Sequence, residues 1–199
     1  MTRVEPSSPG FPSAPARPPP RIDNWFFAFR PDSSARDAAA RRRGWLFAEQ
    51  GIYGRPVKAE NFHVSLAGFG WHPGRSRKIL DAVRATAAAV VAPPFAVTLD
   101  RARCFQGARG KALVLSGGEG VSAARNFHHL LARAMIQHGL GHYVARRQFT
   151  PHLTLLYTPQ PIAECAVEPV SWTVTEFVLV HSLVGQGRHL IAGRWPLRG

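Results

Sequence analysis

The segment Phe-His-Val-Ser-Leu at residues 62–66 alternates apolar and polar side chains, as is typical of a β-strand. Successive side chains of a strand point to opposite faces of its sheet, so His63 and Ser65 share one face. Val64 and Leu66 share the other face and are expected to pack into the interior. The segment therefore predicts a strand that presents one imidazole and one hydroxyl to the same side.

A second segment, Pro-His-Leu-Thr-Leu at residues 151–155, has the same pattern. His152 and Thr154 lie two residues apart and are expected on one face of a strand, opposite two leucines. A single His-x-Ser or His-x-Thr is more often a packed or surface histidine than a functional one. Two copies in strands of similar setting favour a shared function.

The chemistry that fits this pair is displacement at phosphorus. An attacking oxygen must lose a proton while a leaving oxygen gains one, and imidazole, which titrates near ~6.5, can do either near neutral pH. His63 and His152 are therefore candidate catalytic residues. The hydroxyls of Ser65 and Thr154 are candidate phosphate ligands, because they can donate to the non-bridging oxygens. The sequence has no His-Glu-x-x-His motif and its acidic residues are scattered, so we expect no metal and no cofactor.

The order of predicted elements contains a weak internal repeat. In each half a strand leads to a helix, and the helix leads to a strand that carries one of the histidine motifs. The predicted strands are residues 25–29, 62–69, 95–99, 112–115, 149–157, 172–181 and 189–195, and the predicted helices are residues 34–50, 75–91 and 121–138.

The chain of 199 residues is strongly basic, with 25 Lys and Arg against 12 Asp and Glu and a formal net charge of +13. Such a charge attracts polyanions, of which nucleic-acid phosphates are the commonest. The excess of Arg over Lys is equally typical of a GC-rich genome. Charge alone therefore leaves nucleic-acid binding and neutral composition bias about equally favoured.

The rest of the composition indicates a globular domain with a tail. Residues 1–20 are rich in Pro and Ser and are expected to be disordered, and residues 21–199 to form a single domain. No apolar run is long enough to cross a bilayer, and the start does not resemble a secretory signal. Cys104 and Cys165 are expected to be free thiols. We expect a cytoplasmic protein, without a membrane partner, that is a monomer.

These features resemble one known family, the 2H phosphoesterases, and within it the RNA 2′,3′-cyclic phosphodiesterases, also called 2′-5′ RNA ligases. The resemblance extends from about Asn24 to Leu197. The segments that carry it are residues 26–32 (Phe-Phe-Ala-Phe-Arg-Pro-Asp), 55–57 (Arg-Pro-Val), 61–66, 149–155, 177–182 and 195–197. Each histidine motif alone is weakly specific, whereas both together in family order are strongly specific.

The resemblance implies an α+β, bilobal fold with a pseudo-twofold repeat, in which two antiparallel sheets flanked by helices face a central cleft. It implies hydrolysis of an RNA 2′,3′-cyclic phosphate to a 2′-phosphate, with reversible 2′-5′ ligation as a side activity. His63 would then protonate the leaving 3′ oxygen and His152 would activate water, although the reverse reaction exchanges these roles. The implied partners are RNA ends or small nucleotides that carry the cyclic phosphate.

Two positions depart from the family pattern. Ser65 stands where Thr is usual, which keeps the hydroxyl. Tyr157 stands where members often have Arg, which removes a cationic phosphate contact and offers a surface for stacking a base. Arg30 and Arg147 are candidate replacements for that cation, or ordinary solvated charges. Arg146, beside Arg147, is a third such residue.

The main alternative is a non-catalytic module that binds RNA or a nucleotide on the same fold. Paired histidine motifs argue against it, because binding alone does not need two imidazoles. Physiological ligation differs from hydrolysis only in the direction that the cell uses, and the sequence does not decide between them.

Overall fold

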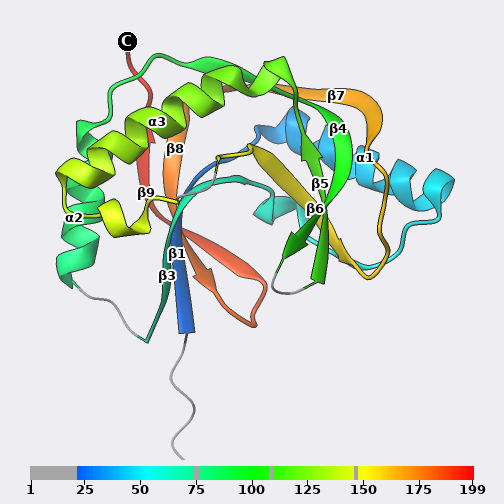
Figure 1. The fold of residues 1–199 in the computed structure, drawn as a ribbon, viewed down its shortest axis with the longest axis horizontal. Coiled ribbons are helices and arrows are strands. Elements are labelled where there is room, and N and C mark those ends of the chain that lie inside the picture. Colours follow the sequence, from blue (N-terminus) through cyan, green and yellow to red (C-terminus); the bar gives the residue numbers. More distant parts are fainter. Residues whose placement is uncertain (1–21, 74–76, 108–109, 146–147) are drawn as a thin grey trace, which may run out of the picture.

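The computed structural model describes residues 22–73, 77–107, 110–145 and 148–199 (Figure 1). The predicted tail at residues 1–20 lies outside these ranges, as do Arg146 and Arg147. The helices are α1 (Ser33–Gln50), α2 (Arg77–Ala89) and α3 (Ser122–Gln137). The strands are β1 (Ile22–Phe29), β2 (Arg55–Pro56), β3 (Val64–Pro73), β4 (Phe95–Gly107), β5 (Gly110–Ser116), β6 (His152–Thr158), β7 (Cys165–Val174), β8 (Glu176–Leu183) and β9 (Arg188–Pro196).

Within the described ranges the strands form one antiparallel sheet in the order β7-β4-β5-β6-β3-β1-β8-β9, with the short β2 paired to β6. The sheet has two four-stranded halves, which meet where Val64 of β3 pairs with Leu153 of β6. The strand next to the junction carries a histidine motif in each half: β6 in one and β3 in the other. The next strand outward, β5 or β1, is the one that precedes a helix, α3 or α1. The expected α+β fold is therefore confirmed, and its two sheets are joined edge to edge.

The helices pack on the two halves in different ways. Helix α1 packs against β6 and β7. Helices α2 and α3 pack against each other, α2 contacts β9, and α3 also contacts β4 of the other half (Figure 1). Helix α1 begins where the Asp32 carboxylate accepts a hydrogen bond of 2.8 Å from the Ala35 amide. It ends at Gly51, whose φ of 58° is the left-handed conformation that glycine adopts most readily. The helix predicted for residues 34–50 is thus confirmed.

The main core is an aromatic and aliphatic cluster that both halves share, and a smaller cluster of Phe26, Ala28, Val178 and Val180 lies on β1 and β8. Phe27 of β1 is completely buried, and its ring packs edge-on against Phe69, Phe177 and Trp195 at 5.3, 5.5 and 5.9 Å between centroids. Edge-to-face packing of this kind adds to the free energy gained from burying the rings. The core thereby fixes the positions of β1 and β3, and β3 is the strand of the first histidine motif.

Both motif strands contain a β-bulge at the same point. Along β3, Ser65 pairs with Ala28 and Ala67 with Phe27, so Leu66 is an extra residue. Along β6, Thr154 pairs with Val114 and Leu156 with Leu113, so Leu155 is an extra residue. A bulge interrupts the strict alternation of side chains. Residues beyond each motif therefore face the side opposite to the one that sequence alternation predicts.

One predicted strand was wrong. Residues 172–181 form the end of β7 and the beginning of β8, with a break at Thr175. Strand β7 pairs with β4 at the outer edge of one half, whereas β8 pairs with β1 and β9 in the other. The chain crosses between the halves at Thr175. The apolar run through this region contains no Gly or Pro, so sequence pattern alone merges the two strands.

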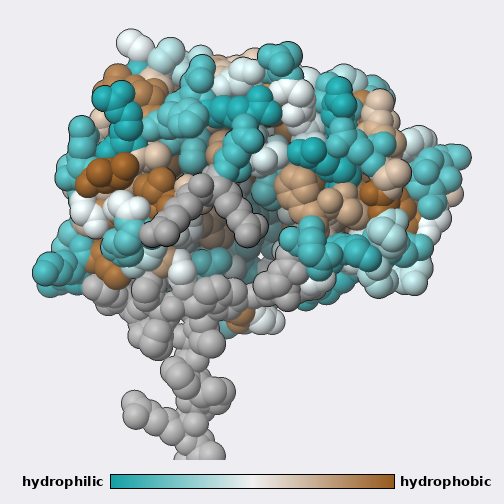
Figure 2. All heavy atoms as spheres, in the orientation of Figure 1, coloured by the Kyte–Doolittle hydropathy of each residue, from teal (hydrophilic) through white to brown (hydrophobic). Residues whose placement is uncertain are grey.

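The face of the molecule shown in Figure 2 is hydrophilic over most of its area, with hydrophobic residues in small patches. In the part of the chain that the structure describes, no helix is both long enough and apolar enough to span a lipid bilayer.

Candidate active site

The two motifs line one cavity of about 580 Å³ next to the junction of the halves. His63, Ser65, His152 and Thr154 all contribute to its lining. One wall is formed by residues 55–58, before the first motif strand, and the opposite wall by the end of β8 and the turn into β9. The structure thus brings the four predicted site residues together around a space that would hold a nucleotide.

The bulges determine which residues follow the motifs into the cavity. Because Leu155 is an extra residue in β6, Tyr157 lies on the same side as Thr154 and lines the cavity. Because Leu66 is an extra residue in β3, Gly68 occupies the equivalent position in the other half and also lines the cavity. The two halves therefore differ here: one contributes an aromatic ring and the other no side chain.

Each imidazole is held by a main-chain carbonyl two residues earlier. Nδ1 of His63 lies 2.6 Å from the Asn61 oxygen, and Nδ1 of His152 lies 2.7 Å from the Thr150 oxygen. A carbonyl only accepts hydrogen bonds, so each Nδ1 carries the proton and donates it. In both neutral rings Nε2 is then the unprotonated nitrogen. This leaves one proton-accepting atom on each ring for a ligand in the cavity.

Burial and neighbouring positive charge keep His63 neutral. The pKa of His63 is lowered to about 4, mainly by burial, despite the hydrogen bond to Asn61, which raises it. His189, His152 and Arg30 contribute to the lowering, because each can place a positive charge near the ring. The ring of His63 also packs at 4.8 Å against Phe26 and at 5.2 Å against His189.

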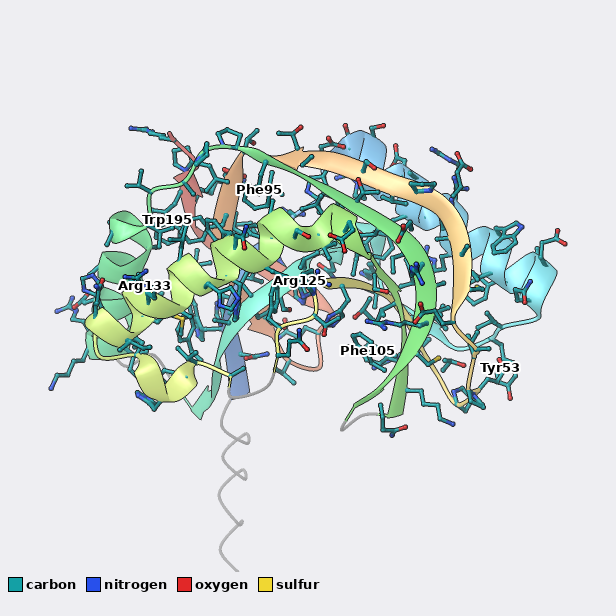
Figure 3. The ribbon with its side chains drawn as sticks, turned by 45° about the horizontal axis from the view of Figure 1, so that its top comes forward. Tyr53, Phe95, Phe105, Arg125, Arg133 and Trp195 are labelled. Carbon is teal, nitrogen blue, oxygen red and sulfur yellow. The ribbon has the colours of Figure 1, made fainter. Side chains whose placement is uncertain are left out.

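The pKa of His152 is also below its ordinary value. Burial is the largest cause, its hydrogen bond to Thr150 opposes the shift, and the charge of Arg103 adds to it. The ring packs edge-on against Phe105 at 4.8 Å. Figure 3 shows Phe105 projecting from the β4–β5 hairpin toward the middle of the molecule. Each histidine thus has a phenylalanine beside it, which excludes water from one side.

Sequence reasoning missed several residues of the cavity. His189 comes from β9, and Arg55, Lys58 and Asn61 from the segment before the first motif. Burial, and then the charge of Arg30, lower the pKa of His189. Arg55 lies in residues 55–57, one of the segments that carry the family resemblance, and this was the one signal in the sequence for its place in the site. Nothing in the pattern of residues along β9 distinguishes His189 from its neighbours.

Asn61 connects the two walls of the cavity. Its side-chain amide is buried and donates a hydrogen bond of 2.8 Å to the carbonyl of Gly187, in the turn between β8 and β9. Its own carbonyl accepts the hydrogen bond from His63. Asn61 therefore fixes the first imidazole and the opposite wall relative to each other.

Arg30, a predicted contact, does not line the cavity. Its guanidinium donates a hydrogen bond of 2.7 Å to the carbonyl of Glu60, and its charge lowers the pKa values of His63 and His189. Arg147 lies outside the described residues. In the ranges that the structure covers, no three His, Cys, Asp or Glu side chains converge closely enough to hold a metal ion.

Two lobes related by an approximate twofold, each with a His-x-Ser or His-x-Thr strand beside a common cavity, define the class as a 2H phosphoesterase. Residues 28–186 match the model of the 2′-5′ RNA ligase superfamily. The chain belongs to this family.

Individual relatives agree with this classification. The chain is 28% identical over 176 residues to an RNA 2′,3′-cyclic phosphodiesterase of Escherichia coli K12, a match that covers 86% of this chain and 95% of the relative. Its structure is similar to that of E. coli LigT solved with 3′-AMP, with a TM-score of 0.68, 26% identity and coverage of 89% and 99%. It is also similar to LigT with ATP, with a TM-score of 0.68, 25% identity and coverage of 90% and 99%.

Proposed function

We propose that this protein hydrolyses the 2′,3′-cyclic phosphate at the end of an RNA to a 2′-phosphate, by proton transfer at His63 and His152. The observation that carries the proposal is the matched pair of imidazoles beside one cavity, each with Nδ1 bound to the main chain. Both rings are oriented in the same way, and neither is used to support a distant part of the fold. A cavity that only bound a nucleotide would not need two such rings.

In the proposed reaction a water oxygen attacks phosphorus and the bond from phosphorus to the 3′ oxygen breaks. One imidazole takes the proton from the water and the other gives a proton to the 3′ oxygen, so the proton count is balanced. By family resemblance His152 is the base and His63 the acid. Ser65 and Thr154 donate hydrogen bonds to the non-bridging oxygens, where negative charge increases. When a 5′-hydroxyl of RNA replaces water, the same displacement forms a 2′-5′ linkage.

The relatives support the substrate class. A curated relative is an RNA 2′,3′-cyclic phosphodiesterase, and LigT has been solved with 3′-AMP and with ATP. A cavity volume of about 580 Å³ exceeds what a lone phosphate needs. We therefore expect a nucleotide with its phosphate between the two histidines.

Oligonucleotides that end in a 2′,3′-cyclic phosphate test this function directly. Incubated with the protein and EDTA, they should be converted to 2′-phosphate ends, as identified by phosphorus NMR. An oligonucleotide that ends in a 3′-phosphate is the control and should stay unchanged. Binding without cleavage at high protein concentration would instead establish the binding module, and activity lost in EDTA would contradict the proposed chemistry.

We expect the pH dependence of kcat/KM to be bell-shaped, with its maximum on the acid side of neutrality. One ring must be neutral and the other protonated, so activity falls when both are protonated and when both are neutral. The pKa values of His63, at about 4, and of His152 both lie below 6.5, so both limbs should lie below that pH. The expected pH profile is the same whether His63 or His152 is the base. A maximum above about pH 7 would contradict it.

His189→Phe offers a matched variant for this pH profile. Removing the His189 imidazole removes a positive charge that lowers the pKa of His63, while phenylalanine keeps a ring in place. The limb assigned to His63 should therefore move to higher pH, and the His63 resonances in an NMR titration should move with it.

A further inference from the structure

The proposed reaction concentrates negative charge in a cavity whose four motif residues carry no permanent positive charge. A cyclic phosphate diester carries one negative charge, and its charge concentrates on the non-bridging oxygens as water adds. The hydroxyls of Ser65 and Thr154 are uncharged, and the lowered pKa values of His63 and His152 keep both rings neutral in the free protein. A permanently charged side chain at the cavity would complement the phosphate.

Most cations around the site are held elsewhere. Arg30 donates to the carbonyl of Glu60 and does not line the cavity, and Arg103 forms an ion pair of 3.2 Å with Glu164. Lys58 lines the cavity but has Glu60 at 3.9 Å. Arg55 also lines the cavity, and among the described residues its guanidinium has no ion pair and no hydrogen-bond partner.

Local structure fixes where Arg55 lies. Arg55 pairs with Tyr157 between β2 and β6, and the Val57 amide donates to the carbonyl of Leu155 at 2.9 Å. Gly54 makes this close approach possible, since a Cβ there would lie 2.2 Å from the carbonyl oxygen of Tyr157. The β2 segment is therefore held against the far end of the second motif strand.

The guanidinium of Arg55 lies over the ring of Tyr157, with its central carbon 5.1 Å from the ring centroid. A guanidinium that stacks its flat face on an aromatic ring keeps its N–H edge available to donate hydrogen bonds. The bulge at Leu155 places that ring on the same side of β6 as Thr154. Arg55 thus lines the same cavity as the Thr154 hydroxyl that is proposed to bind phosphate.

We propose that Arg55 is the phosphate-binding cation of this cavity and that Tyr157 is the residue that positions it. The inference rests on the proposed function for the identity of the anion, a nucleotide phosphate. In the complex the guanidinium donates to a non-bridging oxygen while its face stays on the ring. Tyr157 then acts through Arg55, without a charge of its own.

Binding of adenosine 2′-monophosphate, measured by calorimetry, tests the role of Arg55 without any turnover. Arg55→Ala should weaken its affinity by roughly ten- to hundredfold, the range for losing a hydrogen bond to a charged group. Arg41→Ala is the matched control, because it removes the same charge from an exposed site on α1, outside the cavity, and should leave the affinity unchanged. Unchanged affinity in Arg55→Ala would overturn the inference.

The role of Tyr157 needs a measurement that a general loss of structure would not reproduce. Tyr157→Phe keeps the ring and should bind the nucleotide as the unmodified protein does. Tyr157→Ala should weaken binding, and in the Arg55→Ala background it should add little, because its effect passes through Arg55. Fully additive losses would overturn the positioning role.

A charge placed at position 157 gives a gain-of-function test. Tyr157 lies beneath the guanidinium, so Arg55→Ala/Tyr157→Arg returns a cation to nearly the same place. The double variant should recover most of the affinity that Arg55→Ala loses, and failure to recover any would count against a simple charge requirement at this point. If Arg55 is needed for tight binding but the protein does not cleave a cyclic phosphate, the role of Arg55 stands and the proposed function is wrong. If the protein cleaves a cyclic phosphate and Arg55→Ala binds the nucleotide as well as the unmodified protein, the proposed function stands and the role of Arg55 is wrong.

Discussion

His152→Ala is expected to lower kcat for cleavage of a 2′,3′-cyclic phosphate by ~10²–10⁴-fold, and His63→Ala by a similar factor, because each ring carries one proton transfer. The double variant should be little slower than the slower single variant, since two groups that act in one step do not contribute additively. Initial rates at saturating substrate, measured over the pH range of the profile, give these factors.

His129→Ala is the matched control for these variants, because His129 is exposed on α3 and lies outside the cavity. It should keep full activity. Circular dichroism should show all the variants folded, since the motif strands are held mainly by the buried residues between their polar positions. A loss of less than about tenfold in either histidine variant would exclude that ring as an essential acid or base.

Phe27→Ala is expected to have the largest effect on stability, lowering the free energy of unfolding by ~3–5 kcal/mol. The ring is completely buried among three other aromatic rings, so its removal leaves a cavity that the neighbouring strands cannot readily fill. Urea unfolding followed by fluorescence should show a lower midpoint with an unchanged slope.

Ile136→Ala provides the comparison for that loss. Ile136 is 61% exposed on α3, so truncating it should change the free energy of unfolding by no more than about 0.5 kcal/mol. Equal losses in the two variants would mean that the aromatic cluster is not the main source of stability.

Much of the fold could be predicted because local patterns were strong. The helix after β1 has a capping aspartate at its start and a glycine at its end, residue types that favour helix ends, and its observed bounds agree with the predicted range 34–50. The prediction of one strand over residues 172–181 was wrong, because the break at Thr175 depends on the strands with which β7 and β8 pair. Such long-range pairing cannot be recognised in a short apolar segment of sequence.

The cavity was predictable to the extent that it depends on alternation within a strand. His63 and Ser65 follow that rule, as do His152 and Thr154. Tyr157 breaks it, since alternation alone would place Tyr157 opposite Thr154, and only the bulge at Leu155 returns it to the cavity. His189 and Arg55 come from other parts of the chain, so their positions follow from the tertiary arrangement of strands and not from any local pattern.

The junction of the two halves sets the separation of the proposed reacting groups. His63 and His152 are the immediate chain neighbours of Val64 and Leu153, the pair at which the halves meet. Each imidazole is therefore one peptide unit away from the main-chain pairing that joins the two halves. Substitutions in the outer strands are far from this pairing along the sheet, so the spacing of the two rings should tolerate them better than changes at Val64 or Leu153.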